Sequence, residues 1–150
     1  MLRKVDLPPL WLLGCLCLAW VQKSLLPLGL GFGPVWADLL GGLLVGGGVL
    51  LSLLALLDLR RARTTFMPHQ EPERLVTSGV FRLSRNPIYL GDVMILAGFL
   101  LFWDAVPSLV LLPIYVWLLE KRFIEPEEAR LRRKFVAEFR KYETQTRRWL

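Results

Sequence analysis

The sequence has very few residues that could bind a metal ion or act as nucleophiles. It contains one histidine, His69, and two cysteines, Cys15 and Cys17, which lie in an apolar segment. A zinc site takes three or four ligands of these types, and a catalytic triad would depend on His69 with no supporting partner nearby. The sequence therefore indicates neither a metal site nor a triad.

Charged residues are also scarce. They make up 21% of the 150 residues, whereas 54% are hydrophobic and the mean hydropathy is +0.44. A soluble domain is about 25% charged, with its charges distributed along the chain. Here the charges are clustered and leave long uncharged runs, so we predict a single integral membrane domain over residues 1–150.

The uncharged runs predict an all-α, multispan bundle of transmembrane helices. The four predicted spans cover approximately residues 7–26, 35–57, 88–103 and 105–123. The second has the roughly 20 residues that a bilayer core requires, and the last two predict an antiparallel hairpin. A lipoprotein signal ending at Cys15 is disfavoured, because the apolar run before it is short and begins with Pro8 and Pro9.

The second predicted span carries small residues at four-residue spacing. Gly42 and Gly46 form one such pair, and Gly48 and Ser52 form another. Small residues at this spacing allow helix backbones to approach closely in lipid. We therefore expect this helix to pack closely on a neighbour, within the chain or between chains.

The basic residues indicate how the spans are oriented. Of the 19, the N-terminus holds 2, the segment between the second and third spans holds 6, and the tail from Lys121 holds 10. Four spans place all three segments on one side, which the positive-inside rule makes the cytoplasm. We expect a multi-pass protein of the bacterial inner membrane with both termini cytoplasmic. The net charge of +6 then reflects orientation and anionic lipid rather than nucleic acid.

The charged tail predicts an amphipathic cytoplasmic helix against the membrane surface or the bundle. Its apolar stripe consists of Leu131, Phe135, Phe139 and Tyr142. Pro126 stands before Glu127 and Glu128, as is typical of a helix first turn, where acidic groups favour the positive end of the dipole. From residue types alone, a helix N-terminus explains this glutamate pair more simply than a ligand role does.

Residues 75–91, LVTSGVFRLSRNPIYLG, form the most unusual stretch of the chain. A glycine turn, two arginines, an Asn-Pro step and a tyrosine lie around the start of the third span. A loop that only connects two helices does not require this combination of residues. Arg82 and Arg85 fit interfacial anchors and site residues equally well. Asp92 is costly to expose to lipid, so we expect it to face the bundle interior as a packing or cofactor-pocket residue.

Three features occur together in this order: residues 75–91, an apolar hairpin, and the tail sequence EEARLRRKFVAEFRKY. Together they resemble the isoprenylcysteine carboxyl methyltransferase family and its relatives, the phospholipid N-methyltransferases. The family pattern is G-(V/P)-(Y/F)-x-x-x-R-(H/N)-P-x-Y-x-G, a hairpin, and E-E-x-x-L-x-x-x-F-G-x-E-Y-x-x-Y. The resemblance covers about half of the chain, from residue 75 onward.

The resemblance implies a membrane methyltransferase that binds S-adenosyl-L-methionine on the cytoplasmic side, through segments 73–91 and 122–142. The acceptor would be lipid-like or small and hydrophobic, methylated on a carboxylate, amine or thiol. Glu127 matches the carboxylate that holds the positively charged cofactor. The cofactor-binding residues carried over by matched position are Glu73, Arg74, Leu75, Val76, Phe81, Asn86, Pro87, Ile88, Tyr89 and Glu127.

Several positions depart from the family pattern. Asn86 replaces the commoner histidine and cannot titrate near neutrality, so an acid or base role there is not supported. Val136 and Phe139 replace a glycine and a tyrosine. Phe123 stands where eukaryotic members have a substrate arginine, so prenylcysteine is not carried over as substrate. The neighbouring Arg122 is the candidate contact for a substrate carboxylate or phosphate.

Two other functions stay open. NADPH-dependent membrane reductases of the sterol-reductase type carry a similar Arg-His-Pro-x-Tyr-x-Gly element, although the Glu-Glu-x-x-Leu tail favours the methyltransferase. A non-catalytic membrane protein on the same scaffold would explain the replacements at positions 86, 136 and 139. The soluble, Rossmann-like methyltransferase fold is not supported, because no Gly-x-Gly-x-x-Gly follows a strand-like segment.

Overall fold

The computed structural model describes residues 6–33, 35–64 and 72–150. Its helical elements are α1 (Pro8–Leu25), α2 (Val35–Arg61), η2 (Gly79–Arg82), α3 (Pro87–Phe102), η3 (Val106–Val110), α4 (Leu111–Leu119), η4 (Glu120–Ile124), α5 (Glu125–Lys134) and α6 (Val136–Gln145). This part of the chain contains no strand, which confirms the all-α prediction. His69 and the N-terminal basic residues lie outside the described residues.

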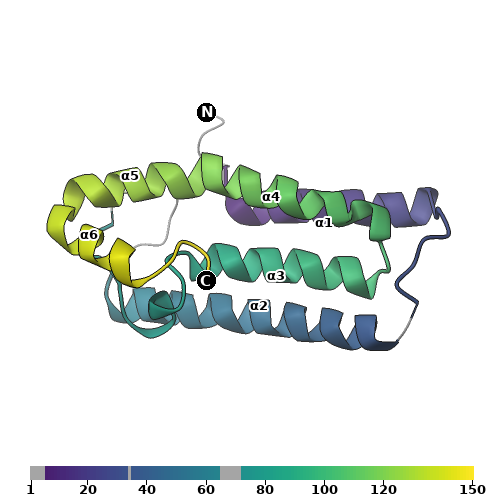
Figure 1. The fold of residues 1–150 in the computed structure, drawn as a ribbon, viewed down its shortest axis with the longest axis horizontal. Coiled ribbons are helices and arrows are strands. Elements are labelled where there is room, and N and C mark those ends of the chain that lie inside the picture. The colour runs from purple at the N-terminus through teal and green to yellow at the C-terminus, as the bar shows by residue number, and fades with distance from the viewer. Residues whose placement is uncertain (1–5, 34, 65–71) are drawn as a thin grey trace.

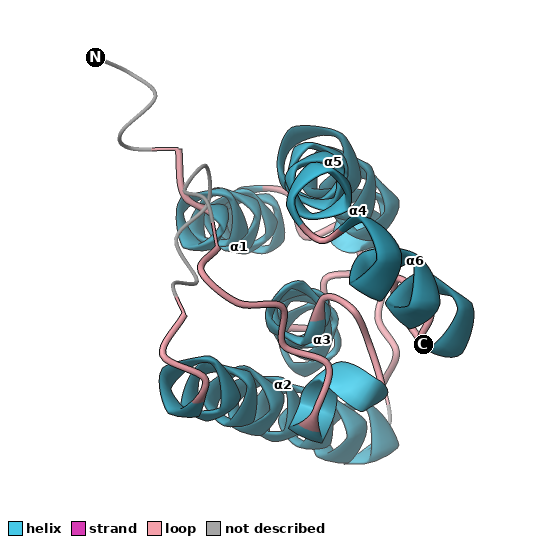
Figure 2. Ribbon diagram, turned by 90° about the vertical axis from the view of Figure 1, so that its left-hand side faces the viewer, coloured by secondary structure: helices cyan, strands magenta, loops and turns pink. Residues whose placement is uncertain are grey.

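Helix α3 is the centre of the bundle (Figures 1 and 2). Helix α2 packs along one side of it, and α1 and α4 pack on the other. Leu96 and Leu100 of α3 are fully buried, together with Tyr115 and Leu119 of α4. Pro87 occupies the first turn of α3, where its missing N–H leaves no helical hydrogen bond unmade. The Asn-Pro step is therefore the entry into the central helix.

Helices α2 and α3 approach each other through glycines. A Cβ atom at Gly48 would lie 2.6 Å from the Gly91 carbonyl oxygen, and one at Gly98 would lie 2.6 Å from the Gly41 carbonyl oxygen. Side chains at these positions would force the two helices apart. The contacting glycines recur every seven residues on each helix, which is about two turns.

The expected small-residue pairs of α2 behave differently from each other. Gly48 and Ser52 both face α3, since the Ser52 hydroxyl lies against Gly91. Gly42 and Gly46 are exposed, and a Cβ at either would have nothing within 4 Å. Within the chain, the close approach therefore depends on Gly41 and Gly48 rather than on the Gly42–Gly46 pair.

Much of the outer surface of the bundle is apolar. In the described part of the chain, α2 is the one helix long and apolar enough to cross a membrane, and α3 is a shorter apolar helix. Helix α1 also exposes large side chains, with Leu13 56% and Trp20 58% exposed. Exposed apolar surface of this extent is typical of a protein that contacts lipid. Helices α1, α2 and α3 lie close to the residue ranges of the first three predicted spans, and the crossing of the membrane by all of them stays a prediction.

The fourth predicted span, residues 105–123, differs from the structure in where it ends. Elements η3, α4, η4 and α5 follow one another without a break, so the helical segment continues well beyond residue 123. A π-helical turn at Glu120–Ile124 precedes Pro126. Proline has no N–H and clashes with the carbonyl four residues earlier, and a wider turn accommodates it. Pro126 therefore lies within this continuous segment and does not begin a separate helix.

The expectation of one continuous amphipathic tail helix is wrong. At Phe135 the backbone leaves the helical region, with φ −120° and ψ 57°, and the tail divides into α5 and α6. The break turns α6 back, so that Arg132 forms an ion pair with Glu143 and Phe139 becomes buried. Burial of that ring offsets the hydrogen bonds lost at the break.

Candidate functional site

The loop before α3 is held by the end of α2. Gly79 has a positive φ of 61°, and a Cβ there would collide with the Asp58 carboxylate. That carboxylate accepts a hydrogen bond from the Val80 N–H at 3.0 Å and so fixes the first turn of η2. Glycine is thus required by both the backbone conformation and the close approach of Asp58. This explains the glycine turn of the 75–91 stretch.

The C-terminal segment holds the next part of the loop. The Arg148 carbonyl oxygen accepts hydrogen bonds from Ser84 Oγ at 3.2 Å and from Asn86 Nδ2 at 3.1 Å. The Arg85 N–H donates to the Arg147 carbonyl at 3.0 Å. We call residues 147–149 the C-terminal strap. It fixes the orientation of the Asn86 side chain at the entry to α3.

Glu127 and Tyr89 meet between α5 and α3. The Tyr89 hydroxyl donates a hydrogen bond to Glu127 Oε2 at 3.0 Å. Withdrawal from water raises the pKa of the Glu127 carboxyl, while the hydrogen bond from Tyr89 and the charge of Arg130 oppose that rise. Glu127 therefore offers a carboxylate in an apolar setting without a direct ion pair in the described part of the chain.

Glu128 has very different surroundings from its neighbour. Its side chain is 4% exposed and pairs with Arg85 at 3.3 Å, with Arg132 at 3.4 Å and with Arg148 at 2.9 Å. Arg85 also pairs with Glu143 at 3.1 Å. Glu128 thus joins α5, the loop and the strap, and its charge is already compensated.

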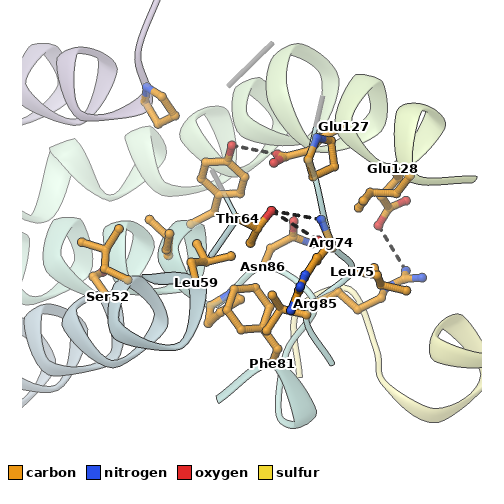
Figure 3. A pocket seen from close by; sticks show the side chains of 18 of the residues that line it. Ser52, Leu59, Thr64, Arg74, Leu75, Phe81, Arg85, Asn86, Glu127 and Glu128 are labelled. Carbon is orange, nitrogen blue, oxygen red and sulfur yellow. Dashed lines mark hydrogen bonds and ion pairs between the residues drawn. The ribbon is translucent and has the colours of Figure 1, made fainter. Parts of the chain in front are cut away.

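These elements enclose a cavity of about 370 Å³ (Figure 3). Nine of the ten predicted cofactor-binding residues line it, which are Arg74, Leu75, Val76, Phe81, Asn86, Pro87, Ile88, Tyr89 and Glu127. The volume lies within the roughly 300–1,000 Å³ typical of small-molecule sites. The structure therefore brings together residues that are up to about 50 positions apart in sequence.

Two predicted residues lie elsewhere. Glu73 is exposed and does not line the cavity. Arg122 is also outside it: its Nε is 2.7 Å from Asp6 Oδ2, and its guanidinium stacks over the Trp11 ring at 5.3 Å. Arg82 is exposed, whereas Arg85 is half-buried at the cavity wall, so the two arginines have different roles.

The cavity is also lined by Asp92, which was expected as a packing or cofactor-pocket residue, and by residues of α2 that were not predicted to lie there. Its deeper end is lined by Ser52, Leu56 and Leu59 of α2 and by Asp92 of α3. Asp92 is buried, as expected from its position in an apolar span. The sequence did not mark Ser52 as a cavity residue, because a serine among glycines is equally typical of helix packing.

The chain is similar in sequence to a known protein family over most of the residues that line this cavity. A family model described as phospholipid methyltransferase matches residues 36–138, which is more than half of the chain. The chain belongs to the phospholipid methyltransferase family. The matched range runs from the start of α2 into α6 and contains Ser52, Asp92 and Glu127. The family membership confirms the resemblance and implies a membrane methyltransferase.

No curated protein and no solved structure matches the chain. The residues that the structure describes also contain no group of three or more His, Cys, Asp or Glu side chains that could hold a metal ion. Membership of the phospholipid methyltransferase family therefore indicates the class of reaction, and the cavity shows which residues lie together.

Proposed function

We propose that the protein uses S-adenosyl-L-methionine to methylate a lipid-like or small hydrophobic acceptor at the membrane. The observation that carries this proposal is the single cavity in which loop residues, Tyr89 and Glu127 meet at one end and apolar residues of α1 and α2 meet at the other. A polar, cationic cofactor and an apolar acceptor require a site of this mixed character.

The cofactor end is formed by the loop, the start of α3 and α5. The cofactor carries a sulfonium and an ammonium group, and Glu127 provides a carboxylate in an apolar setting with no direct ion pair in the described part of the chain, where its attraction for a cation is strong. Phe81 offers an aromatic face beside Leu75 and Val76 at the same end. The residues present therefore fit such a cofactor.

The chain's own contribution is positioning. When bound, the cofactor supplies a methyl group on a positively charged sulfur. Glu127 would hold the ammonium group of the cofactor, with its carboxylate oriented by the Tyr89 hydroxyl, while the buried surroundings exclude water. No titratable group is required at position 86, so Asn86 in place of histidine is compatible with this role.

The acceptor end faces the space between α1 and α2. Helix α1 packs against α3, η3 and α4, whereas α2 packs against α3 and η2. Pro8 and Pro9 of α1 line the cavity together with Leu56 and Leu59 of α2. An apolar acceptor could therefore enter sideways from the bilayer, with the charged end of the bundle at the cytoplasmic surface and both termini cytoplasmic.

Titration calorimetry tests this proposal. Detergent-purified protein is titrated with S-adenosylhomocysteine, and NADPH serves as the control ligand. We expect saturable binding of S-adenosylhomocysteine alone. Binding of NADPH alone would support a reductase instead. Binding of neither ligand to folded protein would overturn the proposal in favour of a non-catalytic role.

A further inference from the structure

The loop before α3 is hydrogen-bonded both to α6 and to the C-terminal strap. The Tyr142 hydroxyl donates to the Phe81 carbonyl oxygen at 2.5 Å. The Arg148 carbonyl oxygen accepts from Ser84 Oγ and from Asn86 Nδ2. Phe81 and Asn86 both line the cavity. The end of the chain therefore supports two residues of the cavity wall.

Arg148 anchors the strap on α5 through a two-point contact. Its Nε lies 3.2 Å from Glu128 Oε1, and its Nη2 lies 2.9 Å from Glu128 Oε2. A bidentate contact between a guanidinium and a carboxylate fixes orientation as well as distance. Trp149 adds a second anchor, because its Nε1 donates to Glu120 Oε1 at 2.7 Å. These two anchors hold the Arg148 carbonyl oxygen in place.

The position of that carbonyl determines which atom of the Asn86 amide stays available. Nδ2 donates to the Arg148 carbonyl oxygen at 3.1 Å, and the reversed amide would place two oxygen acceptors together. Oδ1 accepts no hydrogen bond within the described part of the chain, and Asn86 lines the cavity (Figure 3). Asn86 therefore offers its amide oxygen to a ligand.

We propose that Arg148 is a positioning residue of the ligand site and that it acts through Asn86. Its contact with Glu128 holds the strap carbonyl that engages Asn86 Nδ2, and Asn86 Oδ1 then accepts a hydrogen bond from the ligand. This inference rests on the proposed function for the identity of the ligand, in which the N–H and O–H groups of S-adenosyl-L-methionine are the donors. Arg148 lies outside residues 36–138, which the family model matches.

The Asn86 amide can be observed directly, because Asn86 is the one asparagine of the sequence. Protein made with asparagine labelled with ¹⁵N in its side chain should give a single NH₂ signal pair by NMR in detergent. A hydrogen-bonded N–H exchanges with water more slowly than a free one. Arg148→Ala should accelerate exchange of the bonded proton by about threefold or more, because the protection of one hydrogen bond is lost.

Arg147→Ala is the matched control, since it removes the same charge from the neighbouring, exposed side chain and keeps both strap carbonyls. It should show the exchange rate of the wild type. Arg148→Ala should stay folded in a melting experiment, because Glu128 keeps Arg85 and Arg132 as partners. Unchanged exchange in Arg148→Ala, or equal acceleration in both variants, would overturn the proposal. A lower melting temperature with unchanged exchange would mark Arg148 as structural.

Ligand binding tests whether Arg148 acts through Asn86. The wild type, Arg148→Ala, Asn86→Ala and the double variant are each titrated calorimetrically with S-adenosylhomocysteine. Each single substitution should weaken binding by about threefold or more, the effect of one hydrogen bond. The double variant should bind like Asn86→Ala alone, because residues that act through one contact are not additive. Effects that multiply in the double variant would overturn the proposal.

A ¹³C label at Cγ of the same asparagine tests the role of the amide oxygen. S-adenosylhomocysteine should shift the Cγ signal of the wild type, while the bonded amide proton stays protected from exchange. Saturable binding without this shift would overturn the role of Oδ1. Failure of the wild type to bind S-adenosylhomocysteine would count against the proposed function alone, since the exchange rates without ligand still decide whether Arg148 holds Asn86.

Discussion

Glu127 and Glu128 are adjacent in sequence and differ in almost every physical respect. Glu128 is compensated by three arginines, whereas Glu127 has a tyrosine hydroxyl and an apolar cavity. Their different surroundings follow from the helical turn of about 100° per residue, which points one side chain at the loop and the strap and the other at α3. A helix N-terminus therefore does not account for the pair.

Glu127→Gln should weaken S-adenosylhomocysteine binding by about tenfold or more, because it removes the carboxylate while keeping the side-chain shape. Burial raises the pKa of Glu127, so the charged form costs stability at neutral pH, and the variant should melt no lower than the wild type. Calorimetry and a melting curve measure the two effects. The matched control is Glu125→Gln, since Glu125 pairs with exposed Lys121 and does not line the cavity.

The Glu127 carboxylate should also make the affinity for S-adenosylhomocysteine depend on pH. The ligand ammonium binds the ionised form, so affinity should fall as the pH drops through the raised pKa of Glu127, with a limit of about tenfold per pH unit. Calorimetric titrations between pH 8 and pH 5 in roughly one-unit steps would measure this. Glu127→Gln should show a flat profile, and an equally sloping profile in the variant would remove Glu127 from the site.

At the scale of elements, the packing of α2 on α3 determines where the cavity wall lies. A Cβ at Gly48 would meet the Gly91 carbonyl oxygen at 2.6 Å and Ile95 Cγ1 at 2.9 Å. Any side chain there must move the backbone of α3. Since α3 carries both Tyr89 and Asp92, such a movement would displace both of these cavity-lining residues.

Gly48→Leu should therefore lower the free energy of unfolding by about 1–3 kcal/mol through overpacking, and it should also weaken ligand binding. Gly46→Leu is the control, because a Cβ at Gly46 has nothing within 4 Å. Thermal melting in detergent compares the two variants. Equal melting temperatures for both would show that the close approach of α2 and α3 does not contribute to stability.

The sequence predicted the helical elements and most of the residues that line the cavity for identifiable reasons. Asp92 and the 75–91 stretch carry polar groups where an apolar span begins. Placing such groups in lipid costs free energy, so their presence indicated a function. The break at Phe135 was not predicted, because the apolar stripe continues across it with helical spacing. The ion pairs of Glu128 depend on the return of the C-terminal strap, which no local pattern encodes. Ser52 became a site residue only through its neighbour across the helix interface.

At the scale of the whole molecule, the two ends of the bundle differ in chemistry. One end carries the loop, α5, α6 and most of the basic residues of the described chain. At the other end, Lys23 forms an ion pair with Asp104 at 3.7 Å, and Asp104 also accepts a hydrogen bond from the Phe32 N–H. This asymmetry supports a cytoplasmic position for the site end.

Reporter fusions test the orientation. Green fluorescent protein fused after Leu150 should fluoresce, and alkaline phosphatase inserted between α1 and α2 at Leu30 should be active, because the two positions lie at opposite ends of the bundle. Exchanging the two reporters at the same positions provides the control. An active phosphatase after Leu150 would contradict the four-span arrangement with cytoplasmic termini.

The C-terminal strap has a consequence for biogenesis. Residues 84–86 obtain hydrogen-bond partners from Arg147 and Arg148, which are synthesised more than 60 positions later. Spans enter the bilayer in the order of their synthesis, but the loop at the mouth of the cavity stays unsupported until translation has passed the strap. The helices can thus form before the cavity wall at residues 84–86 has its hydrogen-bond partners, so assembly of the cavity depends on the strap as well as on the helices.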